Sequence, residues 1–246
     1  MARKPARKSA RPTATQESAT QASSASSASS TPSGSRDKVV AAFLELLAER
    51  HFEDIGLSEI ATRAGVSLAQ LRDEFASTLA ILAAHIKATD RAVLAADLSD
   101  MDEEPPRERL FDVLMRRLEV LAPHREAVRS LLRSARRNPP LAIALNGLAT
   151  GSQQWMLTAA GIEASGPRGA LSAQGLTVLF GSVLRTWVHD DDPGLARTMA
   201  ALDRALARGQ RVAGFVDDLL RIPERLCRLR PRRRGRSDDA EESARA

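Results

Sequence analysis

The feature that most constrains this chain is the stretch at residues 57–75, which reads LSEIATRAGVSLAQLRDEF. Its apolar residues recur at helical rather than alternating spacing, and they fall into two groups separated by a short connection. In the second group Leu68, Leu71 and Phe75 are spaced i, i+3 and i+7, which places them on one stripe of a helix. The stretch therefore predicts two short helices in close succession.

The connection at residues 64–67 has the composition of a tight turn. Gly65 favours the left-handed conformation that ends a helix, and we expect Val66 to fill the angle between the two helices. Ser67 is a typical N-cap residue, because its hydroxyl accepts a hydrogen bond from a free N–H group of the next helix. Two short helices on such a turn predict a helix-turn-helix, with an ordinary helical corner as the alternative.

The helix-turn-helix resembles the N-terminal domain of the TetR family of bacterial repressors, over roughly residues 36–85. The first helix of that domain matches an amphipathic segment with Val39, Phe43 and Leu47 on its apolar face. The sequence departs from the family at Arg72, where a tyrosine is usual. The residues that carry the resemblance are Ile60, Ala61, Ala64, Gly65, Val66, Ser67, Leu71 and Phe75.

The resemblance implies a homodimeric transcription regulator, expected to be a repressor, that binds a palindromic operator in double-stranded DNA. Two-fold symmetry places the two recognition helices about 34–36 Å apart, one turn of DNA. On this interpretation Ser67, Gln70 and Arg72 face the DNA, with Gln70 and Arg72 on base edges and Ser67 on phosphate. The family also implies that a small molecule bound in the body of the protein changes operator binding.

The whole chain of 246 residues predicts an all-α fold of nine helices, since Ala, Leu and Arg dominate and runs of β-branched residues are absent. A helix at 79–98 is expected to connect the headpiece to the body. Changes of composition mark off two tails, and the resemblance implies a headpiece and a body between them, which gives four parts. These are a disordered basic tail rich in Ser and Ala at 1–35, the headpiece with the DNA-binding motif at 36–85, a helical body for ligand binding and dimerisation at 86–223, and a disordered Arg-rich tail at 224–246.

The apolar segment at 141–160 is the candidate effector site. Gly147 and Gly151 leave room for a ligand, while Trp155 and Met156 offer adaptable apolar walls. The alternative is that all four pack the core. Because few polar residues lie in this segment, the expected ligand is mainly apolar. The polar candidates are Asn146, Gln153 and Gln154.

The last two predicted helices form an antiparallel hairpin over residues 171–222. We expect the second of them to start with Asp192 as its N-cap and Pro193 at its first position. The apolar stripe of the hairpin is too broad to remain in water. It therefore predicts a homodimer contact with Leu202 and Leu206 near the interface.

Charge is unevenly distributed along the chain. Residues 36–80 carry five basic and eight acidic side chains, a net charge of −3, whereas residues 1–35 carry five basic side chains and one acidic one. Phosphate contacts supply most of the non-specific affinity for DNA. A negative headpiece therefore needs attraction from the basic tails, or DNA is not the main partner.

A second basic region lies on the sixth predicted helix, which we expect to begin at Pro123. Its apolar residues face inward and its arginines face outward. A solvated surface and a site for phosphate or acidic lipid both fit this pattern. The outward arginines are Arg125, Arg129, Arg133, Arg136 and Arg137.

The sequence contains no Gly-rich phosphate loop, no nucleophile elbow and no Cys/His cluster with metal-ligand spacing. His85 and His189 each fall beside an apolar stripe, where a hydrogen-bonded core histidine is the simpler interpretation. We therefore expect no enzyme activity, cofactor or metal. A cytoplasmic protein fits the single cysteine, Cys227, and the lack of an apolar run of roughly 20 residues. An organelle transit peptide remains an alternative, because the start of the chain is rich in Arg and Ser.

Another family with this fold suggests a different function. Residues 187–192 (WVHDDD), followed by Thr198 and by residues 202–204 (LDR), are similar to the C-terminal part of the lipid-binding accessory proteins of ubiquinone biosynthesis. Those proteins share the fold without acting on DNA. A negatively charged headpiece fits a protein of this fold that has lost its DNA-binding role.

Overall fold

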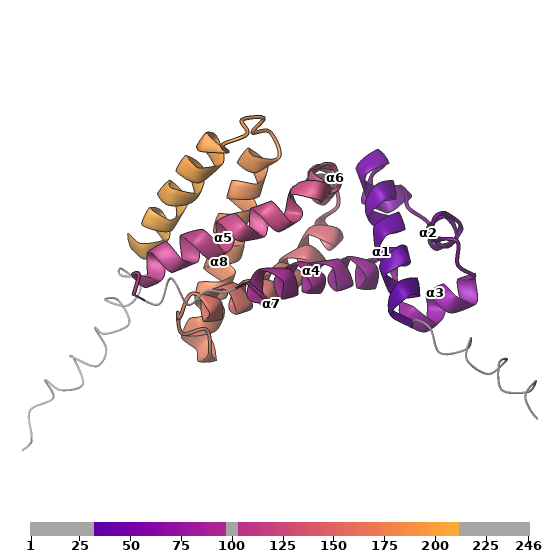
Figure 1. Cartoon of the computed structure of the whole chain (residues 1–246), viewed down its shortest axis with the longest axis horizontal. Helices are drawn as coiled ribbons and strands as arrows, with labels where there is room; N and C mark the ends of the chain where they lie inside the picture. Colours follow the sequence, from indigo (N-terminus) through magenta and orange to yellow (C-terminus); the bar gives the residue numbers. More distant parts are fainter. Residues whose placement is uncertain (1–31, 97–102, 212–246) are drawn as a thin grey trace, which may run out of the picture.

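The computed structural model describes residues 32–96 and 103–211, and every regular element in these two ranges is a helix (Figure 1). The predicted all-α class is thereby confirmed. A helical segment at 196–211 lies where the ninth helix was expected. It follows eight α-helices within these ranges. They are α1 (Pro32–Glu49), α2 (Leu57–Ala64), α3 (Leu68–Glu74), α4 (Thr78–Leu94), α5 (Pro106–Leu121), α6 (Arg125–Arg137), α7 (Pro139–Ala159) and α8 (Gly166–Trp187), with short 3-10 helices at Phe52–Asp54 and Ala122–His124.

Helices α1, α2 and α3 gather at one end of the molecule and share a hydrophobic core with the start of α4 (Figure 1). Phe43, Leu46 and Leu47 of α1 are buried there together with Ile60 of α2. Fully burying a side chain of this size contributes about 1.5–3 kcal/mol. This core is what stabilises α2 and α3, because isolated helices of eight and seven residues are not stable in water.

The body forms a second core, built from α5, α7, α8, the end of α4 and the 196–211 segment. Its most buried side chains include Leu114, Met156, Trp187 and Leu202. Helix α7 packs mainly on α8 and on α4, so it forms the centre of the body.

Two helices connect the two cores. Helix α4 runs from the headpiece into the body (Figure 1), with Ile81 and Leu82 in the first core and Val93 in the second. Helix α6 packs on α1, and its Ser130 hydroxyl donates to the carbonyl of Arg50 at 2.5 Å. The predicted connecting helix is therefore confirmed, and α6 is a second connection that was not predicted.

Several helix boundaries differ from the predicted ones by about a turn. Helix α4 ends at Leu94 rather than at residue 98, and α6 begins at Arg125 because the segment from Pro123 first forms a 3-10 turn. Helix α1 begins at Pro32, inside the stretch expected to be a disordered tail. Residues at helix ends are decided by local hydrogen bonds, which an apolar pattern does not record.

The predicted start of the ninth helix is wrong. The Asp192 carboxylate accepts from the N–H groups of Gly194 at 3.3 Å and Ala196 at 3.1 Å, so Pro193 and Gly194 form a turn and the helix starts at residue 196. A second carboxylate, two residues earlier in the chain, also accepts hydrogen bonds from the start of this helix. The Asp190 carboxylate accepts from both the N–H, at 2.8 Å, and the hydroxyl of Thr198, at 2.7 Å.

Some expectations concern residues that lie outside the described ranges. These are the two tails beyond residues 32 and 211, Cys227 and the expected end of the ninth helix near Ile222. Among the helices that are described, none has the length and apolar character needed to cross a membrane.

Candidate nucleic-acid interface and effector site

Helices α2 and α3 meet at the turn that the sequence predicts. Gly65 has φ +65° and ψ +35°, the left-handed conformation that glycine adopts without strain. Its N–H donates to the carbonyl of Thr62 at 3.2 Å, and the N–H of Val66 donates to the carbonyl of Ala61 at 3.0 Å. Val66 packs half-buried on the headpiece core. Both turn predictions are confirmed, and the angle between the two helices is fixed.

A capping box closes the N-terminus of α3. The Ser67 hydroxyl accepts from the N–H of Gln70 at 3.2 Å, and the side-chain oxygen of Gln70 accepts from the N–H of Ser67 at 2.8 Å. Ser67 is therefore the N-cap, as predicted. The side chain of Gln70 is folded back onto the helix, and its NH2 group is the donor left for an external acceptor.

The outward face of α3 carries an apolar side chain and one positive charge. Leu68 is 54% exposed, so its predicted place on the buried stripe with Leu71 and Phe75 is wrong. It is the first residue of α3, and helical side chains lean toward the N-terminus, which carries Leu68 past the edge of the small core. Arg72 is exposed on the same helix and donates to the carbonyl of Ala76 at 3.4 Å.

Most positive charges of the headpiece are paired with carboxylates. The pairs are Arg36–Glu74 at 3.3 Å, Arg50–Glu59 at 3.0 Å and Arg63–Glu49 at 3.0 Å. Hydrogen bonds from Arg63 lower the pKa of the Glu49 carboxyl. Among the described residues of the headpiece, Lys38 and Arg72 are the basic side chains without a carboxylate partner. The negative charge seen in the sequence therefore persists at the surface, and Arg72 is the free cation on α3.

A buried polar cluster joins α4, α5 and α7 inside the body. Arg117 donates to the carboxylate of Asp90 at 2.5 Å, and the Ser152 hydroxyl donates to the same oxygen at 2.7 Å. All three residues are at most 8% exposed. A buried ion pair is tolerated only when hydrogen bonds offset its lost hydration. The cluster thus fixes the body end of α4 against two body helices.

This cluster was not predicted, although the sequence held a signal for it. Asp90 lies four residues after Ile86 and three before Val93, and Arg117 lies three residues after Leu114. Both charges therefore sit inside apolar helical stripes. Charged residues are almost never fully buried unless they are paired, so two such charges of opposite sign indicate a buried pair.

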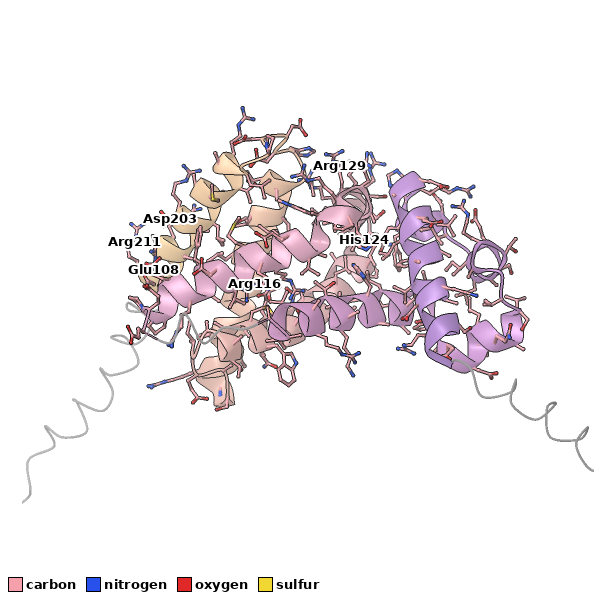
Figure 2. The ribbon with its side chains drawn as sticks, viewed as in Figure 1. Glu108, Arg116, His124, Arg129, Asp203 and Arg211 are labelled. Atoms are coloured by element: carbon pink, nitrogen blue, oxygen red, sulfur yellow. The ribbon has the colours of Figure 1, made fainter. Side chains whose placement is uncertain are left out.

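Two histidines lie close together, His85 of α4 and His124 of the 3-10 helix between α5 and α6, with ring centres 5.1 Å apart and planes at 90° (His124 is labelled in Figure 2). Burial lowers the pKa of His85 to about 4, with smaller contributions from His124 and Arg117. Burial also lowers the pKa of His124. Both rings are neutral at pH 7. The Nε2 of His85 has no hydrogen-bond partner among the described residues, and His189, the other expected core histidine, is exposed.

The four residues expected to line an effector pocket do not share a cavity. Gly147 and Gly151 are exposed with open space beside them, and Trp155 is 57% exposed. Met156 is buried in the body core instead. Positions four apart on a helix share a face, whereas position 156 is turned about 100° from position 155. The two glycines and the tryptophan therefore lie on the outward face of α7 and Met156 on its inward face, so the four residues do not surround one cavity.

An open groove with a volume of about 590 Å³ lies at the end of α7. Trp155 lines it together with Gln154 and Thr158 of the same helix, and residues 161–165 of the loop before α8 complete it. Of the residues expected at an effector site, Trp155 and Gln154 are therefore found at a concave surface.

The two leucines expected at a dimer contact are inside the chain's own core. Leu202 is fully buried and Leu206 nearly so, against α5 and α8 residues of the same chain. Both side chains therefore pack within the chain itself, and a dimer contact near them stays a prediction. The exposed large apolar side chains of this region are Leu171 and Val178 of α8 and Met199.

The same arrangement of helices occurs in solved structures of TetR transcriptional regulators. One from Nitrosomonas europaea is 24% identical, with a TM-score of 0.56, covering 71% of this chain and 97% of that one. Another from Rhodococcus sp. RHA1 is 21% identical, with a TM-score of 0.51, covering 72% and 95% of the two chains. No family model and no curated protein matches the sequence. The chain therefore has the TetR-like fold that the helix-turn-helix residues predicted.

Proposed function

We propose that this protein is a DNA-binding transcriptional regulator that acts as a homodimer on a palindromic operator, with α3 as its recognition helix. One observation carries the proposal. The helix-turn-helix is built to hold α3 rigidly, through the left-handed Gly65 and the Ser67 capping box, while the side chains of Leu68 and Arg72 stay exposed. Repression by occupying the operator is the simplest mode of action.

The exposed groups of α3 suit contacts to the major groove. Arg72 is expected to contact a guanine edge, and Leu68 to contact a thymine methyl group. Ser67 and Gln70 keep the helix end in place and offer weaker polar contacts. The other headpiece arginines are paired, so general attraction to phosphate is expected from the five basic residues of the N-terminal tail. This tail precedes helix α1, which contacts α3 through Arg36.

We further propose that a small, mainly apolar ligand modulates operator binding from the groove at Trp155. Its volume of about 590 Å³ falls within the range of small-molecule sites. Helix α7 carries Trp155 at the groove and, one turn earlier, Ser152 bonded to Asp90 of α4. A ligand that shifts α7 would therefore act on α4 and on the spacing of the two recognition helices.

Selection of bound sequences from random double-stranded DNA tests the proposal with the full-length protein. We expect enrichment of a palindromic site, and loss of that enrichment in Arg72→Ala. Arg91→Ala is the matched control, since Arg91 is also an exposed helical arginine but lies at the body end of α4. Failure of the wild-type protein to enrich any sequence would contradict a DNA-binding role.

The pairing of the headpiece cations favours one other function, a lipid-binding accessory role without DNA binding. In that case the groove at Trp155 holds an isoprenoid or acyl chain. Organic extraction of the purified protein followed by mass spectrometry would then release a stoichiometric lipid, and the DNA selection would enrich nothing. A lipid-free protein that selects an operator supports the regulator.

A further inference from the structure

A small basic pocket lies between α6 and the end of α8. Its volume is about 160 Å³. Arg129, on its wall, is labelled at the upper edge of the body in Figure 2. The lining residues are Arg129, Leu132, Arg133 and Arg136 from α6, and Arg185, Val188 and His189 from the end of α8.

Helical spacing explains how α6 contributes three arginines to one pocket. Positions 129, 133 and 136 are separated by four and then three residues, so they lie on the same face of the helix. The neighbouring face of α6 is buried against α1 through small residues such as Ser130 and Ser134. Three of the five outward arginines expected from the sequence are thus brought to a concave surface by the packing of α8.

Two arginines of α6 have a structural role that accounts for them. Arg125 donates to the carbonyl of Asp190 at 2.9 Å, and Nε of Arg129 donates to the carbonyl of Val188 at 3.1 Å. Arg129 also pairs with Glu126 at 2.6 Å. These contacts satisfy carbonyl groups just after the C-terminus of α8, where the helix carries partial negative charge.

The other three arginines of the pocket have no such structural role. Arg133, Arg136 and Arg185 have neither a carboxylate nor a carbonyl partner within the described ranges. Two carboxylates on the adjoining segments are already engaged, Glu126 by Arg129 and Asp190 by Thr198. Like charges gathered around a concave site repel one another, and an anion held between them removes that repulsion.

We infer that this basic pocket binds a phosphate-bearing group, on a soluble metabolite or on a lipid headgroup. The guanidinium group is planar and always charged, and it donates two parallel hydrogen bonds to phosphate oxygens. Three such groups from two helices would surround one phosphate or pyrophosphate. The occupant would also fasten α8 to α6, the helix that contacts the headpiece through Ser130 and Arg50. The inference does not depend on DNA binding.

Calorimetric titration of the full-length protein with inorganic pyrophosphate tests the pocket. The variant Arg133→Gln/Arg185→Gln removes one free arginine from each helix, and Arg91→Gln/Arg204→Gln removes two exposed arginines elsewhere with the same change of charge. We expect the pocket variant to bind about tenfold more weakly or worse, and the control to bind within about twofold of the wild type. Circular dichroism at the start of each titration shows that both variants are folded.

Flotation with vesicles distinguishes the two sources of phosphate. Phosphatidylcholine vesicles with added phosphatidic acid are compared with phosphatidylcholine alone. Vesicle binding that the pocket variant loses assigns the site to a lipid headgroup, and pyrophosphate binding without vesicle binding assigns it to a soluble molecule. The inference is overturned if the wild type binds neither probe, or if the pocket and control variants lose binding equally, since total charge alone would then explain the result.

Discussion

Replacing Asp90 with alanine would test the most consequential contact in the body. The substitution removes the carboxylate that accepts from Arg117 at 2.5 Å and from Ser152 at 2.7 Å. The Arg117 side chain is only 7% exposed, so its charge stays buried without a counterion. Breaking a buried pair in this way costs about 3–5 kcal/mol. We expect Asp90→Ala to lower the free energy of unfolding by that amount, measured by urea denaturation.

Two further variants decide whether the loss comes from the unpaired charge. Asp112→Ala removes an exposed aspartate from α5 and is expected to change stability by no more than about 0.5 kcal/mol. Asp90→Leu/Arg117→Leu removes both charges, and we expect it to regain most of the stability that Asp90→Ala loses, because burying apolar groups carries no dehydration cost. The reasoning is refuted if Asp90→Ala costs less than about 1 kcal/mol, or if the double variant is no more stable than the single one.

Three other perturbations have defined outcomes. Gly65→Ala forces a Cβ into the left-handed region at φ +65° without a clash, so it should cost about 1–2 kcal/mol in urea unfolding. The pKa of His85 falls from 6.5 to about 4 on folding. The free energy of unfolding is therefore highest above pH 6.5, and it declines by roughly 3 kcal/mol as the pH drops through 4. His85→Gln should flatten this profile. Leu206→Glu should unfold the chain because Leu206 is buried, whereas Val178→Glu, on an exposed site, should leave the circular dichroism unchanged and weaken only a dimer seen by sedimentation.

The local features of the helix-turn-helix could be predicted because they depend on adjacent residues. A left-handed turn at Gly65 and a cap at Ser67 require only the chain within a few positions on either side. The all-α class and the helix connecting headpiece to body followed from periodicity over longer segments. Leu68 was misplaced because its spacing fits the buried stripe, while the shortness of α3 leaves no core beneath it.

The candidate effector site could not be predicted because it depends on which faces meet. Helix α7 is apolar around most of its surface, so its sequence does not show that Trp155 points outward and Met156 inward. The stripe containing Leu202 predicts burial, but it does not say whether the partner is the same chain or another. The buried pair of Asp90 and Arg117 spans 27 residues of sequence and appears only when α4 and α5 pack together.

The central claim is that α3 recognises DNA through its one free cation, Arg72. Fluorescence anisotropy on the selected operator at fixed salt compares wild type, Arg72→Ala and the control Arg91→Ala. We predict that Arg72→Ala weakens binding by about 1–3 kcal/mol, roughly five- to 150-fold, while Arg91→Ala leaves affinity unchanged. A wild-type protein that binds operator and scrambled DNA alike, or an Arg72→Ala variant that binds as tightly as the wild type, would contradict the claim.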